Sequence, residues 1–459
     1  MKYLFIFLSI SIMLSCQSSK KHNNFVGNAG EVKVIVLDPG HFHADLLLKS
    51  GLSNINDTVY VYAPVGNELQ QFSDRIDLYN QRTDYPTSWV KIIYQSDDFL
   101  AKMVAEKKGN VVILAGNNKN KTNYILESVK AGLNVLSDKP MAIDKTNFLI
   151  LEDAFKIAKE NNVLIYDVMT ERYNILNIIQ KELIGDEALF GKLQQGTQEN
   201  PAVELQSIHH FYKLVSGSPL VRPSWYYDVK QQGEGLVDVT THLIDIINWK
   251  CFPEEALDYK KDVDVVNAKR WPTVISKQQF KQSTLCDSFP RYLVENIKDS
   301  SLYVYANGTM TYKVKNSYVK LDVVWNYEAS EGGGDTHSSI IRGTKSVCEV
   351  VQDKEHQYKP ELYIYNADED DSDAFESNLK AKITKIQQQY PFVSYHKVGN
   401  KFRINVPMEF REGHETHFSR VASKYFEFLQ DGKMPEWECK NMIAKYYITT
   451  TALEIAKKQ

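Results

Sequence analysis

Three polar side chains in this sequence could together move a proton and support hydride transfer at an alcohol. Lys139 stands between Asp138 and a proline after a short apolar run, and Asp238 and His242 lie four residues apart. Removal of a hydroxyl proton requires a positioned base, and histidine most often serves. We therefore predict three catalytic residues: His242 as the proton acceptor, Lys139 to hold the hydroxyl oxygen or assist the proton transfer, and Asp238 to orient the substrate.

Lys139 is positioned by a predicted βαβ unit over residues 109–143. The apolar run 111–114 predicts a strand, the pattern 122–131 predicts a helix, and residues 134–136 predict a second strand. Chemistry in open α/β sheets takes place at the carboxyl ends of such strands. The pattern therefore delivers Lys139 to that place, and the competing interpretation is a surface lysine in a loop.

Asp238 and His242 follow Gly233 and Gly235 and belong to an apolar helical pattern. Residues four apart in a helix lie on one face, about 5 to 6 Å from each other. We also expect Asp245 to accept a hydrogen bond from the other ring nitrogen of His242, or to cap a neighbour. The alternative is a core helix that carries a satisfied histidine.

A strand of alternating valines at 32–36 leads into a loop and a helix start, a geometry that holds a pyrophosphate. The usual glycine fingerprint is degraded, since Gly40 remains but Asp38 stands at the first glycine position and His43 near the third. The acid that binds the ribose is also missing after the next strand, 59–62. Histidines and amides in such loops also cap helices, which is the alternative role. The candidate cofactor contacts in this loop are Asp38, Gly40, His41 and His43.

These motifs resemble the Gfo/Idh/MocA superfamily of sugar and inositol dehydrogenases. The resemblance rests on Lys-Ala-Gly at 130–132, Asn-Val-Leu at 134–136, Asp-Lys-Pro at 138–140, and two glycines followed by Asp-x-x-x-His at 233–242. Asp138 stands where the superfamily usually has glutamate. The resemblance covers most of the chain after residue 30. It implies NAD or NADP as the cofactor, a small-molecule sugar or glycoside as the substrate, and a homo-oligomer. It also implies that Asn117, Asn118, Asp138 and Lys139 are cofactor contacts.

Aromatic and polar residues near these motifs could contact a sugar, because flat amphipathic rings stack on sugar rings. Each has a structural alternative: core packing for Trp225, a salt bridge at a helix start for Arg172, and helix capping for His414. His414 and His417 are three residues apart and not four as in H-E-x-x-H, so no metal site is predicted. The candidate substrate contacts are Arg172, Arg222, Trp225, Asp238, His337 and His414.

The 459 residues suffice for two domains, and their patterns predict an α/β fold. Residues 31–175 alternate strands and helices as in a Rossmann-type parallel sheet. Residues 176–440 predict a second α/β domain with a large, mostly antiparallel sheet, in which Asn307-Gly308 forms a hairpin turn. The resemblance implies that this domain binds the substrate and carries the oligomer interface. Residues 441–459 predict a C-terminal helix that packs back on the first domain.

Residues 1–16 combine an early lysine, an apolar core and Leu-Ser-Cys. This pattern predicts a bacterial lipoprotein signal peptide with the lipid on Cys16, and the alternative is an ordinary cleaved signal. Residues 17–30 are polar and predict a tether. We therefore expect an exported protein, periplasmic or anchored to the outer membrane, whose contact with the membrane is the lipid alone. A net charge of -4 gives no basis for nucleic-acid binding.

Together these features predict an NAD(P)-dependent oxidoreductase that acts on a secondary hydroxyl of a sugar or glycoside. Export favours a cofactor that stays bound between turnovers, because free NAD(P) is scarce outside the cytoplasm. Two alternatives remain open. One is glycoside hydrolysis through transient oxidation and elimination with the same cofactor, and the other is a carbohydrate-binding lipoprotein that has lost the cofactor.

Overall fold

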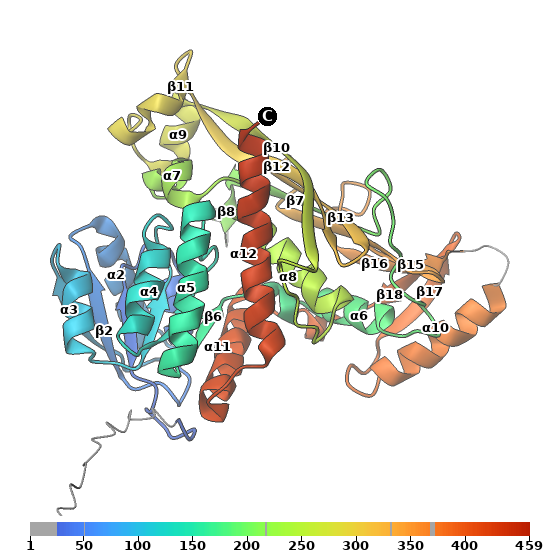
Figure 1. Ribbon diagram of the computed structural model, residues 1–459, viewed down its shortest axis with the longest axis horizontal. Coiled ribbons are helices and arrows are strands. Elements are labelled where there is room, and N and C mark those ends of the chain that lie inside the picture. The colour runs from blue at the N-terminus through green and yellow to red at the C-terminus, as the bar shows by residue number, and fades with distance from the viewer. Residues whose placement is uncertain (1–24, 50, 216–217, 331–332, 368–371) are drawn as a thin grey trace, which may run out of the picture.

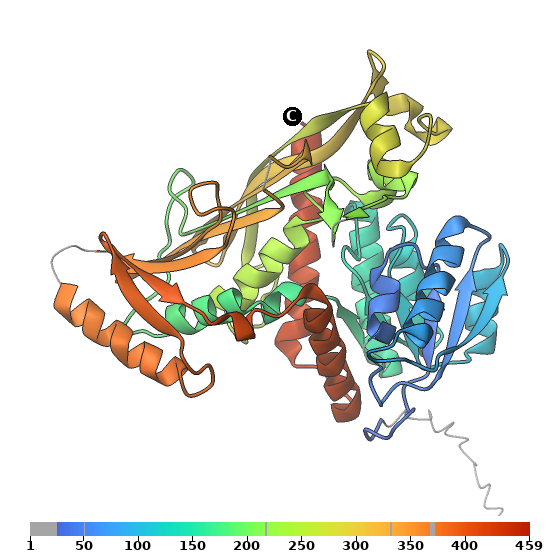
Figure 2. The ribbon, with the colours of Figure 1, turned by 180° about the vertical axis from the view of Figure 1, so that it is seen from behind.

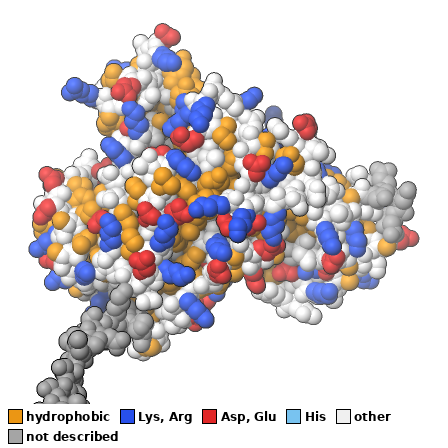
Figure 3. Space-filling model, viewed as in Figure 1, with side chains coloured by type: hydrophobic (Ala, Val, Ile, Leu, Met, Phe, Trp, Pro, Cys, Tyr) orange, Lys and Arg blue, Asp and Glu red, His pale blue; other side chains and the backbone are white. Residues whose placement is uncertain are grey.

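The computed structural model describes residues 25–49, 51–215, 218–330, 333–367 and 372–459. Cys16, the predicted lipid attachment site, and the predicted signal peptide lie outside the described residues. None of the described helices is both long enough and apolar enough to cross a membrane. Positive and negative side chains are intermixed over the face of the molecule shown in Figure 3.

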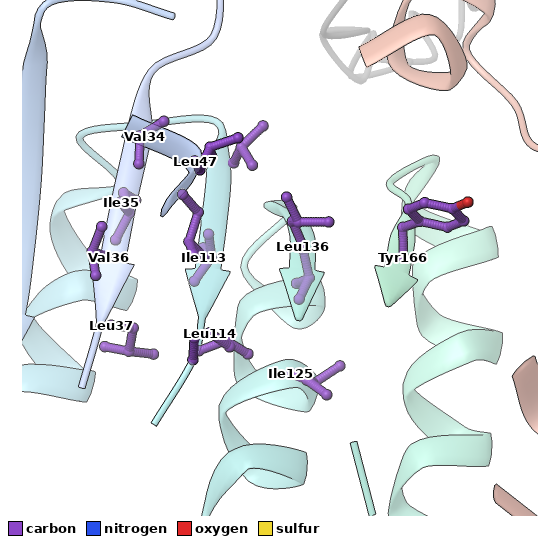
Figure 4. Close-up of a cluster of buried hydrophobic side chains, with 14 of the residues drawn as sticks. Val34, Ile35, Val36, Leu37, Leu47, Ile113, Leu114, Ile125, Leu136 and Tyr166 are labelled. Carbon is purple, nitrogen blue, oxygen red and sulfur yellow. The ribbon is translucent and has the colours of Figure 1, made fainter. Parts of the chain in front are cut away.

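The first domain is a six-stranded parallel sheet in the order β3-β2-β1-β4-β5-β6, with helices on its faces (Figure 1). This confirms the predicted Rossmann-type sheet. The strands β1 and β4 are buried over their whole length because their residues are apolar on both faces (Figure 4). The strands are β1 Val34–Leu37, β2 Thr58–Ala63, β3 Val90–Gln95, β4 Val111–Leu114, β5 Asn134–Ser137 and β6 Ile165–Asp167; the helices are α1 His43–Lys49, α2 Asn67–Gln81, α3 Phe99–Glu106, α4 Lys121–Lys130 and α5 Lys145–Asn161.

The second domain is built on a ten-stranded, mostly antiparallel sheet, which confirms the predicted architecture. Its strand order is β10-β12-β13-β7-β14-β15-β16-β18-β17, with β11 paired to β12, and the pair β13 and β7 is parallel. The strands are β7 Val203–Tyr212, β10 Val263–Ser276, β11 Ile297–Lys298, β12 Ser301–Val314, β13 Ser317–Glu328, β14 Thr336–Arg342, β15 Ser346–Val351, β16 Glu361–Asn366, β17 Ser394–Val398 and β18 Lys401–Asn405. Helices of this part are α6 Ile175–Ile184, α7 Val229–Gln232, α8 Thr240–Cys251, α9 Lys277–Thr284, α10 Ser372–Ile386, α11 His414–Asp431 and α12 Glu436–Lys457.

The predicted hairpin turn at Asn307-Gly308 is wrong, because both residues lie inside the long strand β12. The side chain of Asn307 donates to the carbonyl of Trp271 and accepts from the backbone N–H of Trp325 on the opposite neighbour. Gly308 leaves room for Leu236, whose side chain would lie 2.5 Å from an added Cβ. The Asn-Gly pair therefore serves cross-strand bonding and close packing.

Helix α12 lies between the two domains and contributes to the core of each (Figures 1 and 2). Met442 and Tyr446 pack into the core of the first domain, whereas Ala444 and Ile448 pack into the core of the second. Residues two apart on a helix point to different sides, so one helix can serve both cores. The C-terminal helix thus joins the domains.

A buried ionic network ties the same helix to both domains. Nζ of Lys445 lies 2.7 Å from Asp167 at the end of β6 and 2.8 Å from Asp245 on α8. Arg172, in the short helix η1 (Thr170–Tyr173), donates to both oxygens of Asp245 at 2.6 and 2.7 Å and of Glu438 at 2.8 and 3.0 Å. Burial alone would raise the pKa of Asp245, but the charges of Arg172 and Lys445 hold it below its usual value. The network therefore fixes β6, η1, α8 and α12 against one another.

Replacement of Lys445 by methionine should lower the free energy of unfolding by about 3 kcal/mol, because the buried Asp167 loses its cation and Asp245 keeps only Arg172. The matched control is Lys440→Met on the same helix. The Lys440 side chain is 44% exposed and pairs with Glu436, whereas that of Lys445 is 0% exposed. The control should change the stability by less than about 1 kcal/mol. Urea denaturation measures both, and equal effects of the two substitutions would contradict a structural role for the network.

Candidate functional site

A cavity of about 660 Å³ lies between the carboxyl ends of the parallel strands and the inner face of the large sheet. Lys139 comes from the end of β5, Asp238 from the turn before α8, and His242 from the first turn of α8. All three side chains line the cavity. The structure therefore brings together the three residues that the sequence predicts as catalytic.

Lys139 and Asp238 form the central ion pair of the cavity, with Nζ 2.5 Å from Oδ1 of Asp238. The other oxygen of Asp238 accepts from the amide of Gln232 at 3.3 Å. The predicted position of Asp238 inside the helix is wrong, since α8 begins at Thr240. Gly235 explains the difference, because an added Cβ would lie 1.9 Å from the carbonyl oxygen of Ala306, and this close approach to β12 holds residues 235–239 in turns.

His242 faces the cavity as a neutral imidazole. Burial, and then the positive charge of Lys139, lower the pKa of His242 well below its ordinary value. Among the described residues its Nδ1 has no hydrogen-bond partner. The predicted pairing with Asp245 is wrong, because both oxygens of Asp245 accept from Arg172 and one also accepts from Lys445. His242 is thus a buried base that no carboxylate orients.

The loop after β1 approaches the loop after β4 closely. Asp38 has φ of 49°, the left-handed conformation that a glycine would normally supply at this position and that aspartate tolerates better than most residues. An added Cβ on Gly116 would lie 2.4 Å from the carbonyl oxygen of Asp38, and one on Gly40 would lie 3.3 Å from Cα of Gly116. The Asp38 carboxylate accepts from Tyr124 at 3.0 Å. Gly116 lines the cavity and was not among the predicted contacts.

His41 and His43 line the same part of the cavity and face Asp138. Their Nδ1 atoms lie 3.4 and 3.1 Å from the two oxygens of Asp138, and Nε2 of His43 lies 3.0 Å from Nε2 of His414. Burial lowers the pKa of His41 and of His414 to about 4.

Asn117 and Asn118 connect the β4 loop to the second domain. The amide of Asn117 donates to the side chain of Gln231 at 2.7 Å, and that of Asn118 donates to the carbonyl of Gln232 at 2.7 Å. Nζ of Lys121 is buried 2.5 Å from the amide oxygen of Asn118. Asn118 lines the cavity, whereas Asn117 is not among the described residues that line it, and the amide groups of both are hydrogen-bonded within the protein.

The predicted substrate contacts fall into two groups. Arg222, Trp225, His337 and His414 line the cavity together with Asp238. Arg172 is not one of the described residues that line it, because its guanidinium is held in the buried network. The guanidinium of Arg222 donates to the carbonyls of Phe211 and His210 and lies over the ring of Tyr226, 4.4 Å from the centroid. The indole N–H of Trp225 donates to Glu68 of α2 at 3.2 Å.

Sequence reasoning missed a hydrogen-bonded chain on the sheet wall of the cavity. Asp335 lies 3.2 Å from Nδ1 of His209, whose Nε2 lies 2.6 Å from Oγ of Ser207, and Ser207 in turn lies 2.9 Å from Nδ1 of His337. Asp335 also accepts from Lys213 at 2.6 Å. The run His209-His210 on an alternating strand was the available signal, but Asp335 is remote in sequence.

The ionisation states of Asp335 and His209 determine which groups donate and which accept in this series of hydrogen bonds. Burial alone would raise the pKa of Asp335, but hydrogen bonds from His209 and His210 lower it, so this carboxylate accepts only. Burial lowers the pKa of His209 to about 4, so its ring is neutral and carries its single proton on Nδ1. The hydroxyl of Ser207 must then donate to His209 and accept from Nδ1 of His337. Nε2 of His337 has no part in this series of hydrogen bonds and can bind a ligand hydroxyl.

Asp335→Asn should lower the free energy of unfolding at pH 7 by about 2 kcal/mol, because Lys213 and two histidines lose an anionic partner. Since the pKa of Asp335 is lowered by folding, the wild-type advantage is complete above about pH 4 and decreases below it. Urea denaturation of both proteins at pH 7 and pH 3 measures the difference. An advantage that does not change with pH would contradict an ionised Asp335.

Comparisons with known proteins agree with this fold. Residues 179–457 match the family described as "Putative oxidoreductase C terminal domain". The chain is 47% identical to a "putative oxidoreductase" from Parabacteroides merdae ATCC 43184, with a TM-score of 0.93 over 95% of this chain and 99% of that one. No curated protein matches the chain.

More distant solved structures share the fold. Levoglucosan dehydrogenase in complex with NADH and levoglucosan is 14% identical, with a TM-score of 0.59 over 93% of this chain and 97% of that one. KijD10, a 3-ketoreductase from Actinomadura kijaniata in complex with NADP, is 12% identical, with a TM-score of 0.53 over 91% of this chain and 95% of that one. At these identities the likeness concerns the fold alone.

Proposed function

Because the chain belongs to the oxidoreductase C-terminal domain family, we propose that it transfers a hydride between NAD(P) and a secondary hydroxyl of a sugar or glycoside. The observation that carries the proposal is the cavity in which the Lys139–Asp238 ion pair lies with the neutral base His242. The cavity opens at the carboxyl ends of the parallel strands, where ligands bind in such sheets. The dehydrogenase and ketoreductase that share the fold were solved with NADH and NADP.

The residues around the first-domain loops fit a dinucleotide. The strand order reverses between β1 and β4, which opens a crevice between the loops that follow them. Gly40 and Gly116 allow these two loops to pack against each other at the crevice, because an added Cβ on Gly116 would lie 2.4 Å from the carbonyl oxygen of Asp38. Residues 38–43 and 116–118 would hold the cofactor, and its nicotinamide supplies the hydride acceptor when bound.

The reaction follows from the ionisation states in the cavity. His242 is neutral and can take the proton of the substrate hydroxyl as the hydride leaves the same carbon. Lys139 has three donor hydrogens, so it can bind Asp238 and the substrate oxygen together and stabilise the negative charge on that oxygen. Asp238 orients the ammonium group and can accept from a neighbouring hydroxyl. Nε2 of His337 can bind a further hydroxyl on the sheet side.

We also propose that the cofactor is retained between turnovers, which rests on the expected export of the protein. A second substrate would then reoxidise the cofactor in place. The comparisons give no support to the two alternatives, hydrolysis by transient oxidation or a binding protein without a cofactor. The direct assay adds sugars and glycosides to purified protein and follows absorbance at 340 nm, first without and then with added NAD or NADP. A rise without added cofactor reports retention, whereas no binding of either nucleotide would exclude the proposed reaction.

Lys139→Met should reduce kcat about 10²- to 10⁴-fold, because the developing charge on the substrate oxygen loses its cation. The control Lys130→Met removes an exposed lysine paired with Glu127 in the adjoining helix α4 and should leave kcat unchanged. Initial rates at saturating NAD(P) measure both. A Lys139→Met enzyme with the wild-type rate would contradict the proposed site.

The pH dependence of kcat/KM tests His242 as the base. The groups that act on it are Lys139 and Asp138 from the end of β5, Asp245 on α8 and His414 on α11, and burial dominates. Because the pKa of His242 is lowered, the ring remains unprotonated well below pH 6.5, and oxidation of the alcohol should not slow as the pH falls from 7.5 to 6. If kcat/KM of the wild type fell to half its maximum near pH 6.5, and this inflection were absent from the pH profile of His242→Gln, the assignment would be contradicted.

A further inference from the structure

Three metal-ligating groups converge on one point of the cavity wall. One ring nitrogen of His41, one ring nitrogen of His43 and a carboxylate oxygen of Asp138 all lie within 4.8 Å of one another. We propose that His41, His43 and Asp138 bind a divalent transition-metal ion. The two histidines belong to the loop and helix that follow β1, and Asp138 follows β5, so the site forms only when the strands of the first domain are assembled.

The spacing suits such an ion. Two ligands at about 2.1 Å from a tetrahedral ion lie about 3.4 Å from each other. Nδ1 of His41 and of His43 lie 3.4 and 3.1 Å from the oxygens of Asp138. Two imidazoles with one carboxylate are typical ligands of zinc, iron, cobalt or manganese, whereas magnesium and calcium prefer oxygen ligands alone.

The hydrogen bonding of His43 supports a cation at this point. Its Nδ1 is buried and has no hydrogen-bond partner among the described residues, although Asp138 is only 3.1 Å away. Its Nε2 lies 3.0 Å from Nε2 of His414, which can accept a hydrogen bond from it. A proton on Nε2 leaves a lone pair on Nδ1 that faces a carboxylate, an arrangement that a metal ion stabilises. Metal-binding histidines usually donate their second N–H in this way.

Nδ1 of His41 can also bind a cation through its lone pair. The N–H of His43 donates to Nδ1 of His41 at 3.4 Å, so this nitrogen also carries a lone pair. Both imidazoles and Asp138 line the cavity, and therefore the remaining coordination positions of the ion are open to a ligand. If the proposed function holds, the ion would attract the negatively charged diphosphate of the dinucleotide. It would then supply charge where Asp38 and His43 have replaced glycines.

The decisive experiment measures metal binding directly. Tag-free protein is stripped with a chelator, incubated with Zn²⁺ or Co²⁺, desalted and examined by elemental analysis, and Co²⁺ also reports its ligands through visible absorption. The wild type should retain about one equivalent. His41→Ala, His43→Ala and Asp138→Asn should each retain less than a tenth of that amount. His41 is the most exposed of the three, so its variant is the least affected in folding.

The control is His356→Ala, which breaks an exposed His–Asp pair of the same kind, with Nδ1 2.7 Å from Asp353. It should bind as much metal as the wild type. Thermal unfolding adds a second measurement, because Zn²⁺ should raise the Tm of the wild type and the control but not that of the His41 variant. Failure of the stripped wild type to bind either ion, or binding by the His41 and His43 variants equal to that of the wild type, would overturn the proposal.

Metal binding and hydride transfer are measured separately. Absorbance at 340 nm in the metal-loaded protein decides the proposed function, whereas elemental analysis of the same protein without nucleotide decides the metal site. A stripped enzyme that reduces NAD(P) but binds no ion would refute the site and leave the oxidoreductase function intact. One equivalent of ion in a protein that binds neither nucleotide would establish the site and refute the function.

Discussion

The geometry of the cavity depends on the buried ionic network around Arg172 and Lys445. Asp245 of that network lies on α8 three residues after His242, and Asp167 ends the strand next to the one that delivers Lys139. The network therefore sets the distance between the two halves of the site as well as the position of α12. A shift of either domain would leave charges buried without partners, which costs several kcal/mol. This cost holds the domains in one arrangement.

The same network determines how His242 works. Asp245 is the carboxylate nearest in sequence to the histidine, but Arg172 and Lys445 occupy its oxygens. Burial and the positive charge of Lys139 lower the pKa of His242 by more than the charges of Asp245 and Asp138 raise it, so the imidazole is neutral. An imidazole whose pKa is lowered in this way is a weaker base than one hydrogen-bonded to a carboxylate. It nevertheless stays unprotonated, and can therefore accept a proton, at neutral and mildly acidic pH. Structural and catalytic demands on α8 are thus met by different residues one turn apart.

Local patterns predicted the fold, and long-range contacts limited the prediction of the site. The buried strands β1 and β4 are recognisable because they are apolar throughout, and Lys139, Asp238 and His242 because their motifs are short. The partners of Arg172 are 73 and 266 residues away, so its structural role could not be read from its neighbours in the chain. Asp335 was missed for the same reason. The local signal at Asn307-Gly308 was overridden by packing within β12.

The conformation of the loop after β1 does not depend on the full set of fingerprint glycines. Asp38 adopts the backbone conformation of the glycine it replaces, and Gly116 on the neighbouring loop provides the close approach that the missing glycines would have given. Side chains then add links that glycines cannot form, because His41 and His43 join the loop to Asp138 at the end of β5. The loop conformation is therefore set by polar side chains from two strands. The loop thus carries polar side chains where glycines were expected, and it still lies at the reversal of strand order between β1 and β4.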